Sequence, residues 1–569
     1  MNSGNYLNAK KEADRIDKII IDTLDEGKSF KVEAGAGSGK TYSLMKVIEW
    51  LRDKKQSEFE KNNKKVVCIT YTNAAVNIIL ERLPENSFII PSTIHSFAWE
   101  NIKQFQKELL KLIKKNNISN EEINIKKVNY TLGIKFVQEE VLYLNHNDVI
   151  NLFVELMDNK KFRKILSSKF PIILIDEYQD TNKKIIEKFL KYYIDKNEGI
   201  QFGFFGDSWQ TIYQSNDACG NIEHNNIKII NKTSNFRSAP LIVDFLNKIK
   251  SETPQISAIE DTEGEVIVIH CNDYKDSREI KGAFKGDLPE EELEKRIEQI
   301  KEKYSKIISK EKKLKILMLT HKILSKYQKY DNLLEIMGED FKNVTDELLL
   351  YTMEIVLPMI TALKNKDASK LFEILKTRPV IKNKKEKKKW ELLYENFIKA
   401  EKGTIKDVLT IIKNSNMIPL SNKIENIYKN MCENPDEIYN NNKTFKQLSD
   451  IQFKEFENGI IYLKKQGIFS TEHGVKGEEY DTVVFVVSRG WNNYQYDKWI
   501  PKINKNISIE NKEAYERNRN LFYVCCSRPT NRLIIFVTFE LKDEFLVFFE
   551  KNLGKEKILN FNDFLSQNF

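Results

Sequence analysis

Short apolar runs alternate with amphipathic stretches through the first part of the chain. Short segments typical of buried strands occur at residues 30–33, 65–70 and 170–175, and the last of them is an unbroken apolar run. Apolar positions spaced three and four residues apart predict helices at residues 42–51 and 74–83. Strands that alternate with helices at this spacing are typical of a parallel sheet, so the pattern predicts an α/β domain.

The alternation is lost in two lysine-rich, polar stretches, residues 98–140 and 322–465. Both are predicted to be helical insertions. The second contains a run of lysines at residues 382–389. Such charge is either a solvated face or a contact to DNA, and for both stretches the two interpretations stay open.

A glycine-rich turn occupies residues 34–39, directly after the first apolar run. Its three glycines allow consecutive backbone N–H groups to converge on an anion, and the helix that follows adds its dipole. Lys40 can reach the β- and γ-phosphates of a nucleotide, and the Thr41 hydroxyl can hold Mg²⁺. The turn is therefore predicted to bind phosphate rather than to be an ordinary Gly/Ala-rich turn, although Ala34 stands where the strict pattern has glycine.

Two carboxylates, Asp176 and Glu177, follow the apolar run at residues 170–175. A buried parallel strand delivers its last residues to the sheet edge at which ligands bind. Asp176 is predicted to bind Mg²⁺, and Glu177 to orient and deprotonate the attacking water. Acidic pairs are common on surfaces, but few follow five apolar residues. A further strand at residues 201–206 leads to Gln210, which is predicted to read the γ-phosphate.

Composition and charge are those of a globular, weakly basic protein. Of 569 residues 41% are hydrophobic, and 91 Lys and Arg against 83 Asp and Glu give +8, which permits nucleic-acid binding without demonstrating it. The six cysteines form no Cys-x-x-Cys pair, so we expect reduced thiols, a cytoplasmic setting and no structural zinc. Neither a signal peptide nor an apolar run of ~18 residues is visible, so we expect no membrane association.

Six motifs occur in the order in which they occur in the UvrD/Rep/PcrA helicases of superfamily 1, and they resemble motifs I to IV of that family. They are residues 34–41, 70–73, 93–96, 176–181, 206–213 and 235–238. The family usually has alanine at the first loop position, so Ala34 supports the resemblance. Residues 469–481 and 519–528 resemble motifs V and VI, which implies a second RecA-like domain in the second half.

The resemblance implies an α/β fold of two RecA-like P-loop NTPase domains with parallel sheets, each carrying a mostly helical insertion. The first domain and its 1B-like helical insertion are expected at residues 1–97, 98–150 and 151–245. The second domain and its 2B-like helical accessory insertion are expected at residues 246–325, 326–465 and 466–569.

ATP and Mg²⁺ are the cofactors that the resemblance implies. Residues implied to bind the nucleotide are Ala34, Gly35, Ala36, Gly37, Ser38, Gly39, Lys40, Thr41, Tyr42, Phe236 and Glu479. The implied catalytic set is Lys40, Asp176, Glu177, Gln210, Arg237 and Arg528. Thr41 and Asp176 are the implied metal ligands, Phe236 would stack on adenine, and the two arginines would act as arginine fingers on the γ-phosphate.

The resemblance also implies contacts to single-stranded DNA. The implied residues are Tyr71, Thr72, Asn73, His95, Tyr213, Thr471 and His473. A lone histidine in a strand–turn is more often a packed or capping residue, so both histidines rest on the resemblance alone. Two positions depart from the family: Lys11 replaces a glutamine that selects adenine, and Ser215 replaces an aromatic that stacks on a base. We therefore expect complete ATPase machinery and an altered DNA motor.

Two functions are compatible with the sequence. The first is a DNA-dependent ATPase that translocates 3′→5′ on single-stranded or tailed DNA and unwinds duplexes. The second is a DNA-sensing, nucleotide-gated regulatory subunit that activates a partner nuclease in anti-phage defence without processive unwinding. Residues 473–479 and 520–529 resemble helicase-like subunits of bacterial anti-phage systems such as Gabija. No nuclease motif follows residue 528, so cleavage would need a partner chain.

Overall fold

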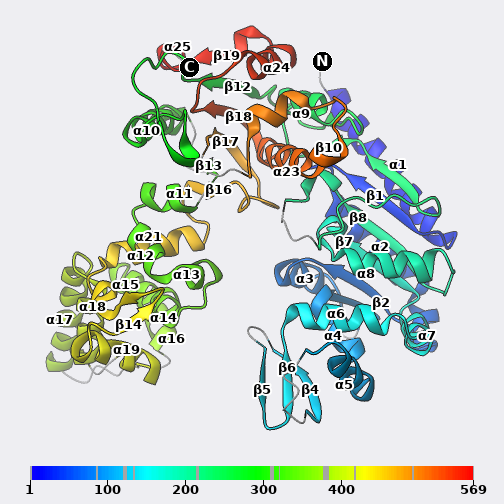
Figure 1. The fold of residues 1–569 in the computed structure, drawn as a ribbon, viewed down its shortest axis with the longest axis horizontal. Coiled ribbons are helices and arrows are strands. Elements are labelled where there is room, and N and C mark those ends of the chain that lie inside the picture. Colours follow the sequence, from blue (N-terminus) through cyan, green and yellow to red (C-terminus); the bar gives the residue numbers. More distant parts are fainter. Residues whose placement is uncertain are drawn as a thin grey trace. The chain divides into compact units, whose positions relative to one another are not determined.

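The computed structural model describes residues 3–84, 87–118, 125–131, 135–212, 217–307, 313–319, 321–375, 384–415, 418, 420–489 and 493–567. The chain forms two compact units, drawn together in Figure 1. Unit 1 is Met1–Leu288, Ser305–Leu314 and Val475–Phe569, and unit 2 is Pro289–Tyr304 and Lys315–Gly474. None of the helices in the described part of the chain combines the length and apolar character of a membrane-spanning segment.

A six-stranded sheet of order β3-β2-β7-β8-β1-β9 forms the first half of unit 1. Its strands are β1 (Phe30–Ala34), β2 (Val66–Thr70), β3 (Ile89–Thr93), β7 (Ile172–Asp176), β8 (Gln201–Gly206) and β9 (Lys228–Lys232). Every neighbouring pair is parallel. The strands therefore all end at one edge, where the predicted phosphate loop, Asp176 and Glu177 follow β1 and β7.

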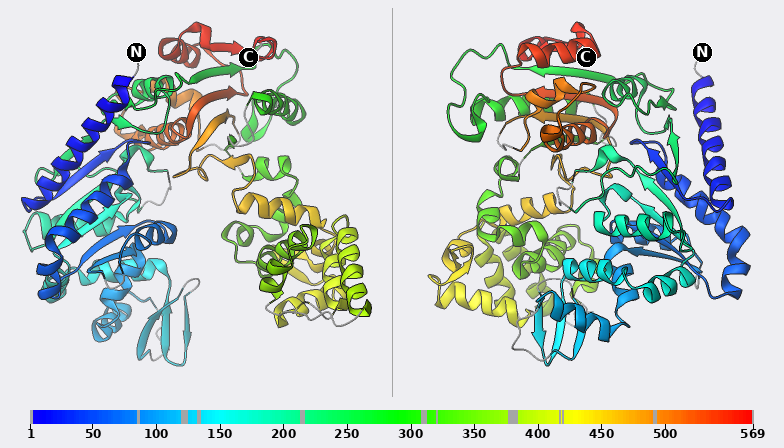
Figure 2. Two further views of the ribbon diagram at one scale, coloured as in Figure 1. Left: turned by 180° about the vertical axis from the view of Figure 1, so that it is seen from behind. Right: turned by 45° about the vertical axis from the view of Figure 1, so that its right-hand side comes forward.

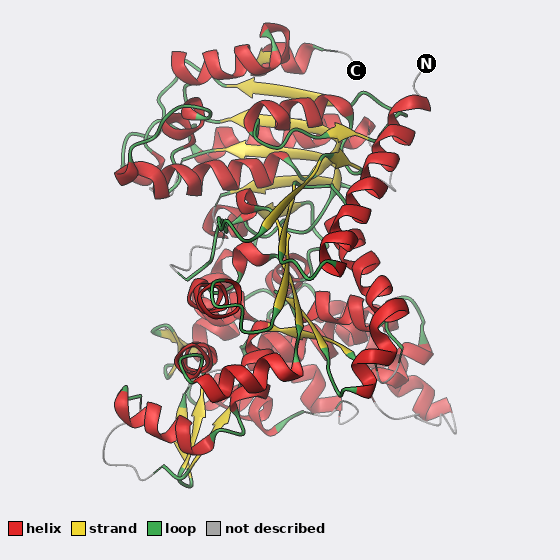
Figure 3. Ribbon diagram, turned by 90° about the vertical axis from the view of Figure 1, so that its right-hand side faces the viewer, coloured by secondary structure: helices red, strands yellow, loops and turns green. Residues whose placement is uncertain are grey.

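Helices cover both faces of this sheet, which Figure 3 shows on edge. Side chains alternate along each strand, so Val66 and Cys68 join one core cluster and Val67 and Ile69 the other. The first cluster packs on α1 (Ser3–Asp25), α2 (Lys40–Lys61) and α3 (Asn73–Leu80). The second packs on α4 (Ile94–Ile102), α5 (Gln106–Lys115), α6 (His146–Leu156), α7 (Lys160–Lys169) and α8 (Lys183–Phe189). Burial on both faces explains why the central strands β2, β7 and β8 are mostly apolar.

The second half of unit 1 repeats this architecture. It contains the parallel strands β17 (Tyr480–Val487), β18 (Pro529–Val537), β12 (Glu265–His270) and β19 (Ile558–Asn560), in that order. Its helices include α9 (Pro240–Ile249), α23 (Ile509–Cys526), α24 (Asp543–Leu553) and α25 (Phe561–Ser566). With the first sheet, this confirms the predicted fold class of two RecA-like domains with parallel sheets.

The prediction that residues 98–140 are helical was wrong in part. Between α5 and α6 lie β4 (Lys127–Tyr130), β5 (Phe136–Gln138) and β6 (Val141–Leu144), which form a three-stranded sheet. A cross-strand pair, Phe136 stacked on Tyr143 with ring centroids 4.7 Å apart, supports it. Strands this short carry too few positions to show a period of two, and their pairing depends on residues distant in sequence.

Unit 2 contains the parallel pair β13 (Leu314–Met318) and β16 (Phe469–Thr471) and is otherwise mainly helical, as Figure 2 shows in two views. Its helices are α10 (Glu290–Ile307, which extends past residue 304 into unit 1), α11 (His321–Tyr327), α12 (Asp331–Met337), α13 (Glu339–Asn343), α14 (Glu347–Tyr351), α15 (Leu357–Lys364), α16 (Ala368–Leu375), α17 (Lys384–Ala400), α18 (Ile405–Ser415), α19 (Asn422–Glu433), α20 (Phe445–Ser449) and α21 (Phe453–Leu463). A small hairpin joins β14 (Ile438–Asn440) to β15 (Lys443–Thr444). The six predicted domain boundaries remain predictions.

Candidate active site

The glycine-rich loop after β1 has a backbone that side chains would obstruct. Gly37 and Gly39 have φ of 77° and 75°, in the left-handed region, and α2 begins at the next residue, Lys40. A Cβ on Gly37 would lie 2.6 Å from Asn235 Oδ1. The amide of Asn235 in turn donates to the Ala36 carbonyl at 3.0 Å. The loop therefore fits closely against residues 235–237 only because glycine stands there.

A cavity of about 330 Å³ opens beside this loop, a volume within the usual range for small-molecule sites. Both RecA-like halves of unit 1 contribute to it. It is lined by Ala34, Gly35, Ala36, Gly37, Ser38, Gly39, Lys40, Thr41, Tyr42, Glu177, Gln210, Phe236, Arg237, Gly477, Glu479 and Arg528. The structure thus brings together all the residues assigned to nucleotide binding, and all the catalytic residues except Asp176, which adjoins Glu177.

Lys40 lies against the acidic pair. Its Nζ is 2.5 Å from Glu177 Oε1 and 4.0 Å from Asp176 Oδ1. Burial raises the pKa of Asp176 to about 6, although Lys40 opposes the shift. Burial would also raise the pKa of Glu177, but Lys40 and Lys476 outweigh it and lower that pKa to about 2. The two neighbouring carboxylates therefore differ in proton affinity, and Asp176 holds a proton more readily than Glu177 does.

The backbone at Glu177 is strained. Its φ is 52°, a left-handed conformation that a glutamate rarely adopts. Glu177 is the first residue after β7, and its conformation lets its N–H donate to Asp176 Oδ1 at 3.0 Å. The Gln179 amide donates to Glu177 Oε2 at 2.5 Å. The carboxylate is thus held by Lys40 on one oxygen and by Gln179 on the other.

The residues present fit a nucleotide phosphate and a magnesium ion. Ser38 Oγ, at the centre of the loop, is buried and has no hydrogen-bond partner among the described residues. An oxyanion in the loop would provide one. The Thr41 hydroxyl and the Asp176 carboxylate are oxygen donors, which Mg²⁺ prefers.

Two arginines, Arg237 and Arg528, line the cavity, and both come after the last strand of the first sheet in the chain. Arg237 Nε lies 3.0 Å from Glu479 Oε2. Arg528 is 1% exposed, and its guanidinium donates to the Val524 carbonyl at 2.9 Å and to Ser527 Oγ at 2.8 Å. Burial, and then the charge of Arg237, lowers the pKa of Arg528 to about 10. Arg528 therefore still carries its charge at neutral pH.

No sequence motif pointed to Lys250. This residue follows α9, is 3% exposed, and places its Nζ 2.7 Å from Asp207 Oδ1 and 3.5 Å from Glu33 Oε1. Asp207 Oδ2 accepts a hydrogen bond from Gln210 Nε2 at 3.0 Å. Burial opposes ionisation of Asp207, but Lys250 outweighs it and the pKa of Asp207 is lowered. Lys250 therefore connects the end of α9 to the residue that holds Gln210.

Lys476 makes a second connection between the two halves. Its Nζ lies 2.5 Å from Asp180 Oδ2 and also donates to the Gln210 carbonyl. Lys476 belongs to the motif V segment and Asp180 to the motif II segment. Asp180 is buried, and burial raises its pKa to about 6 despite Lys476. Lys250 and Lys476 thus both reach the Gln210 region from the second half of unit 1. Their role in connecting the two halves can be recognised only from their neighbours in space.

The residues predicted to bind DNA in unit 1 lie at the ends of β2 and β3. Tyr71 is 46% exposed, and Thr72 caps α3 by accepting the Ala75 N–H at 3.2 Å. His95 lies in α4 with its ring centroid 4.3 Å from that of His146. Burial, and then His146, lowers the pKa of His95 to about 4, so its imidazole is neutral at pH 7. The neighbouring strands place Tyr71, Thr72, Asn73 and His95 near one sheet edge.

The remaining predicted positions fall elsewhere. Thr471 is the last residue of β16 in unit 2 and is buried, and His473 follows this strand. Tyr213 and Ser215 lie outside the described residues. Lys11 is exposed on α1 and is not among the residues that line the cavity. The DNA contacts of these residues remain predictions.

Comparisons with known proteins found one family model and several similar proteins. Residues 17–216 match the family described as AAA domain. The chain is 24% identical to Gabija protein GajB of Bacillus cereus (strain HuB5-5), over 94% of this chain and 96% of that protein. It is 30% identical to the ATP-dependent DNA helicase Rep of Buchnera aphidicola subsp. Acyrthosiphon pisum, over 38% of this chain and 42% of that protein.

A third relative is the mitochondrial ATP-dependent DNA helicase HMI1 of Saccharomyces cerevisiae, 26% identical over 41% of this chain and 39% of that protein. The chain thus spans less than half the length of the Rep and HMI1 relatives. The P-loop cavity, the acidic pair at the end of β7 and the two arginines occur in the order of the family's motifs. The site and the comparisons together support a superfamily 1 helicase of the UvrD/Rep/PcrA type.

Proposed function

We propose that this protein is a DNA-dependent ATPase that translocates 3′→5′ on single-stranded DNA and unwinds tailed duplexes. The observation that carries the proposal is the cavity itself. It places a phosphate loop, Glu177, Gln210 and two arginines around one volume of about 330 Å³. This is the set of groups that phosphoryl transfer to water needs.

Each group has a role that follows from its position. Bound ATP supplies the scissile phosphoanhydride, and Mg²⁺ supplies charge that neutralises its phosphates. Lys40 and the loop N–H groups hold the phosphates, and Thr41 and Asp176 would hold the metal. Glu177 orients the attacking water and accepts its proton. Arg237 and Arg528 stabilise charge on the γ-phosphate, a contribution that is typically ~10³–10⁵ in rate.

Glu177 is held inactive by its ion pair with Lys40. Lys40 is one of the groups that keep the pKa of Glu177 at about 2, which makes the carboxylate a poor base. When Lys40 turns to phosphate oxygens, Glu177 loses its closest cation and its pKa rises toward the ordinary range. Substrate binding would therefore activate the base.

Coupling to DNA would pass through contacts between the two halves of unit 1. Lys476 joins the segment after β16 to Asp180, and Asp180 also acts on Tyr71, whose pKa is raised by burial and then by Asp180. Tyr71 is exposed enough to stack on a base. A change at the γ-phosphate that moves Lys476 would thus reach the DNA-facing edge. Phe236, 36% exposed, and Tyr42 would flank the nucleotide base.

The alternative is a cytoplasmic DNA-sensing ATPase that activates a partner nuclease in anti-phage defence without processive unwinding. The observation that favours it is similarity over nearly the full length of both chains to a protein named Gabija protein GajB. The similarity to Rep, which covers 38% of this chain, favours translocation instead.

Steady-state ATP hydrolysis separates the two functions. The purified chain is assayed without DNA and with single-stranded, blunt duplex and 3′-tailed DNA, and strand displacement is followed on the tailed substrate with a 5′-tailed control. Stimulation by single strands together with displacement of the 3′-tailed strand supports the motor. Stimulation of hydrolysis without strand displacement supports the regulatory ATPase. A rate of hydrolysis that DNA does not change refutes both proposed functions.

A further inference from the structure

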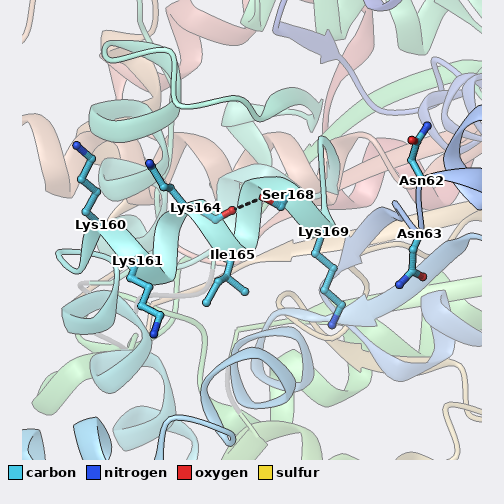
Figure 4. Close-up of a pocket in the computed structure, with 8 residues that line it drawn as sticks. All are labelled: Asn62, Asn63, Lys160, Lys161, Lys164, Ile165, Ser168 and Lys169. Carbon is cyan, nitrogen blue, oxygen red and sulfur yellow. Dashed lines mark hydrogen bonds between the residues drawn. The ribbon is translucent and has the colours of Figure 1, made fainter.

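An open groove of about 710 Å³ lies at the edge of the first sheet opposite to the nucleotide cavity. It runs between the end of α2 and one face of α7, and Figure 4 shows its side chains. The residues that line it, which we call the lysine groove, are Asn62, Asn63, Lys160, Lys161, Lys164, Ile165, Ser168 and Lys169. β2 and β7 begin just beyond it, whereas the phosphate loop and Glu177 follow strands at the other edge.

The groove is positively charged. Its four lysines are exposed, no carboxylate lines it, and within the described part of the chain none of the four forms an ion pair, although Glu100 acts on Lys169 and Glu198 on Lys160 from a distance. Other lysines on the surface behave differently, since Lys115 pairs with Glu155 and Lys188 with Asp158. Burial, and then the charge of Lys65, lowers the pKa of Lys169.

Two of the four charges do not serve the helix. Lys160 and Lys161 occupy the first turn of α7, which has no acidic residue, and cations there oppose the helix dipole, whereas Lys169 lies in the last turn. Two N–H groups of the first turn are already used, because Asn159 Oδ1 accepts from Lys161 and Phe162. A bound polyanion would offset the unfavourable charge at this helix end.

We infer that the lysine groove binds the phosphate backbone of duplex DNA, at a site separate from the single-strand path. Lysines act as point charges on phosphate oxygens and carry no base-reading geometry, so the contact is independent of sequence. None of the lining residues is aromatic, so the groove lacks the platform on which single-stranded bases stack.

The length of the groove suits a duplex. Lys160 and Lys169 are separated by about 14 Å along α7, at about 1.5 Å per residue. A duplex carries about one charge per 1.7 Å of axis, so phosphates are available to all four lysines. The choice of DNA as the polyanion rests on the proposed function. The charge and shape of the groove are observed independently of that function.

The test compares two variants with the same change in net charge. One carries Lys160→Gln, Lys161→Gln, Lys164→Gln and Lys169→Gln. The control carries Lys295→Gln, Lys301→Gln, Lys326→Gln and Lys342→Gln, four unit 2 lysines that pair with glutamates. Binding of a fluorescent blunt duplex is measured by anisotropy between about 50 and 200 mM salt.

We expect the groove variant to bind the duplex at least tenfold more weakly than the parent at about 100 mM salt. Its plot of log affinity against log salt should be shallower by about 2–4, because each phosphate contact contributes about 0.9. The control should keep the parent's slope. Hydrolysis of ATP at saturating single-stranded DNA should be unchanged in both variants, which shows that they are folded.

Three outcomes contradict the inference: a groove variant with the control's slope, a parent that does not bind blunt duplex, or equal loss in both variants. None of these refutes the proposed function, which fails only if single strands do not stimulate hydrolysis by the parent. A double charge reversal, Lys161→Glu with Lys164→Glu, should weaken duplex binding further than neutralising the same two residues.

Discussion

Replacing Lys250 with methionine tests whether a buried ion pair holds the γ-phosphate-sensing region. Lys250 and Asp207 are 4% and 0% exposed at their side chains, and their charged atoms are 2.7 Å apart. Methionine has nearly the same volume, so the substitution removes charge without opening a large cavity. Asp207 would remain buried, with only the Trp209 N–H and the Gln210 amide as donors.

Leaving one member of a buried pair without its partner typically costs about 3–5 kcal/mol, and we expect Lys250→Met to lower the free energy of unfolding by that amount. Asp207→Asn in the Lys250→Met background removes the stranded charge. The double variant should therefore be more stable than the sum of the single effects predicts, with a coupling free energy of about 1–3 kcal/mol.

The pH dependence has a defined sign. Since the pKa of Asp207 is lowered in the folded protein, the pair stabilises above the unfolded pKa of about 3.9, and this contribution is lost as pH falls through the folded value. The difference between parent and Lys250→Met should therefore be full near pH 7 and should shrink in acid.

The assay is urea unfolding followed by tryptophan fluorescence, with ATP hydrolysis measured on the same samples. Lys248→Met is the matched control, because Lys248 lies two residues before Lys250, is exposed and makes only an exposed hydrogen bond to the Asn552 carbonyl among the described residues. It should change stability by no more than about 0.5 kcal/mol. We also expect kcat to fall more than the KM for ATP rises, since Gln210 loses its orientation. Stability of Lys250→Met within about 0.5 kcal/mol of the parent would refute the reasoning.

Three further substitutions test the site. Glu177→Gln should keep nucleotide binding and lower kcat by about 10²–10⁴, the usual contribution of a general base, and turnover within a few-fold of the parent would contradict that role. Lys40→Ala should weaken nucleotide binding by about 10–100-fold, as loss of a charge-assisted phosphate contact does; titration with a fluorescent nucleotide that shows parental affinity would count against it. Tyr71→Ala should weaken single-strand binding by about 5–150-fold and leave DNA-free hydrolysis unchanged, and equal loss of both would show a structural role instead.

Local sequence predicted the elements that carry the nucleotide site. The helix expected at residues 42–51 lies within α2, and the strand expected at residues 30–33 is β1. Both flank the glycine-rich loop, and such signals depend only on near neighbours.

Predictions failed where structure depends on distant partners. The three strands between α5 and α6 are three or four residues long, and they pair with one another rather than with flanking sequence. The lysine-rich composition around them suggested helix. Composition was thus a weaker guide than the cross-strand contacts it could not reveal.

By itself, the sequence determined the P-loop, the acid pair and the two-domain α/β fold. A glycine pattern requires particular backbone angles, and a run of apolar residues must be buried, whatever the rest of the chain does. Only the tertiary structure shows that Lys250 pairs with Asp207 and Lys476 with Asp180. It also shows that four lysines, none of them in an ion pair among the described residues, line one groove. A lysine carries no local mark of its partner, because its charge acts through space and its neighbours are set by how the helices pack on the sheet.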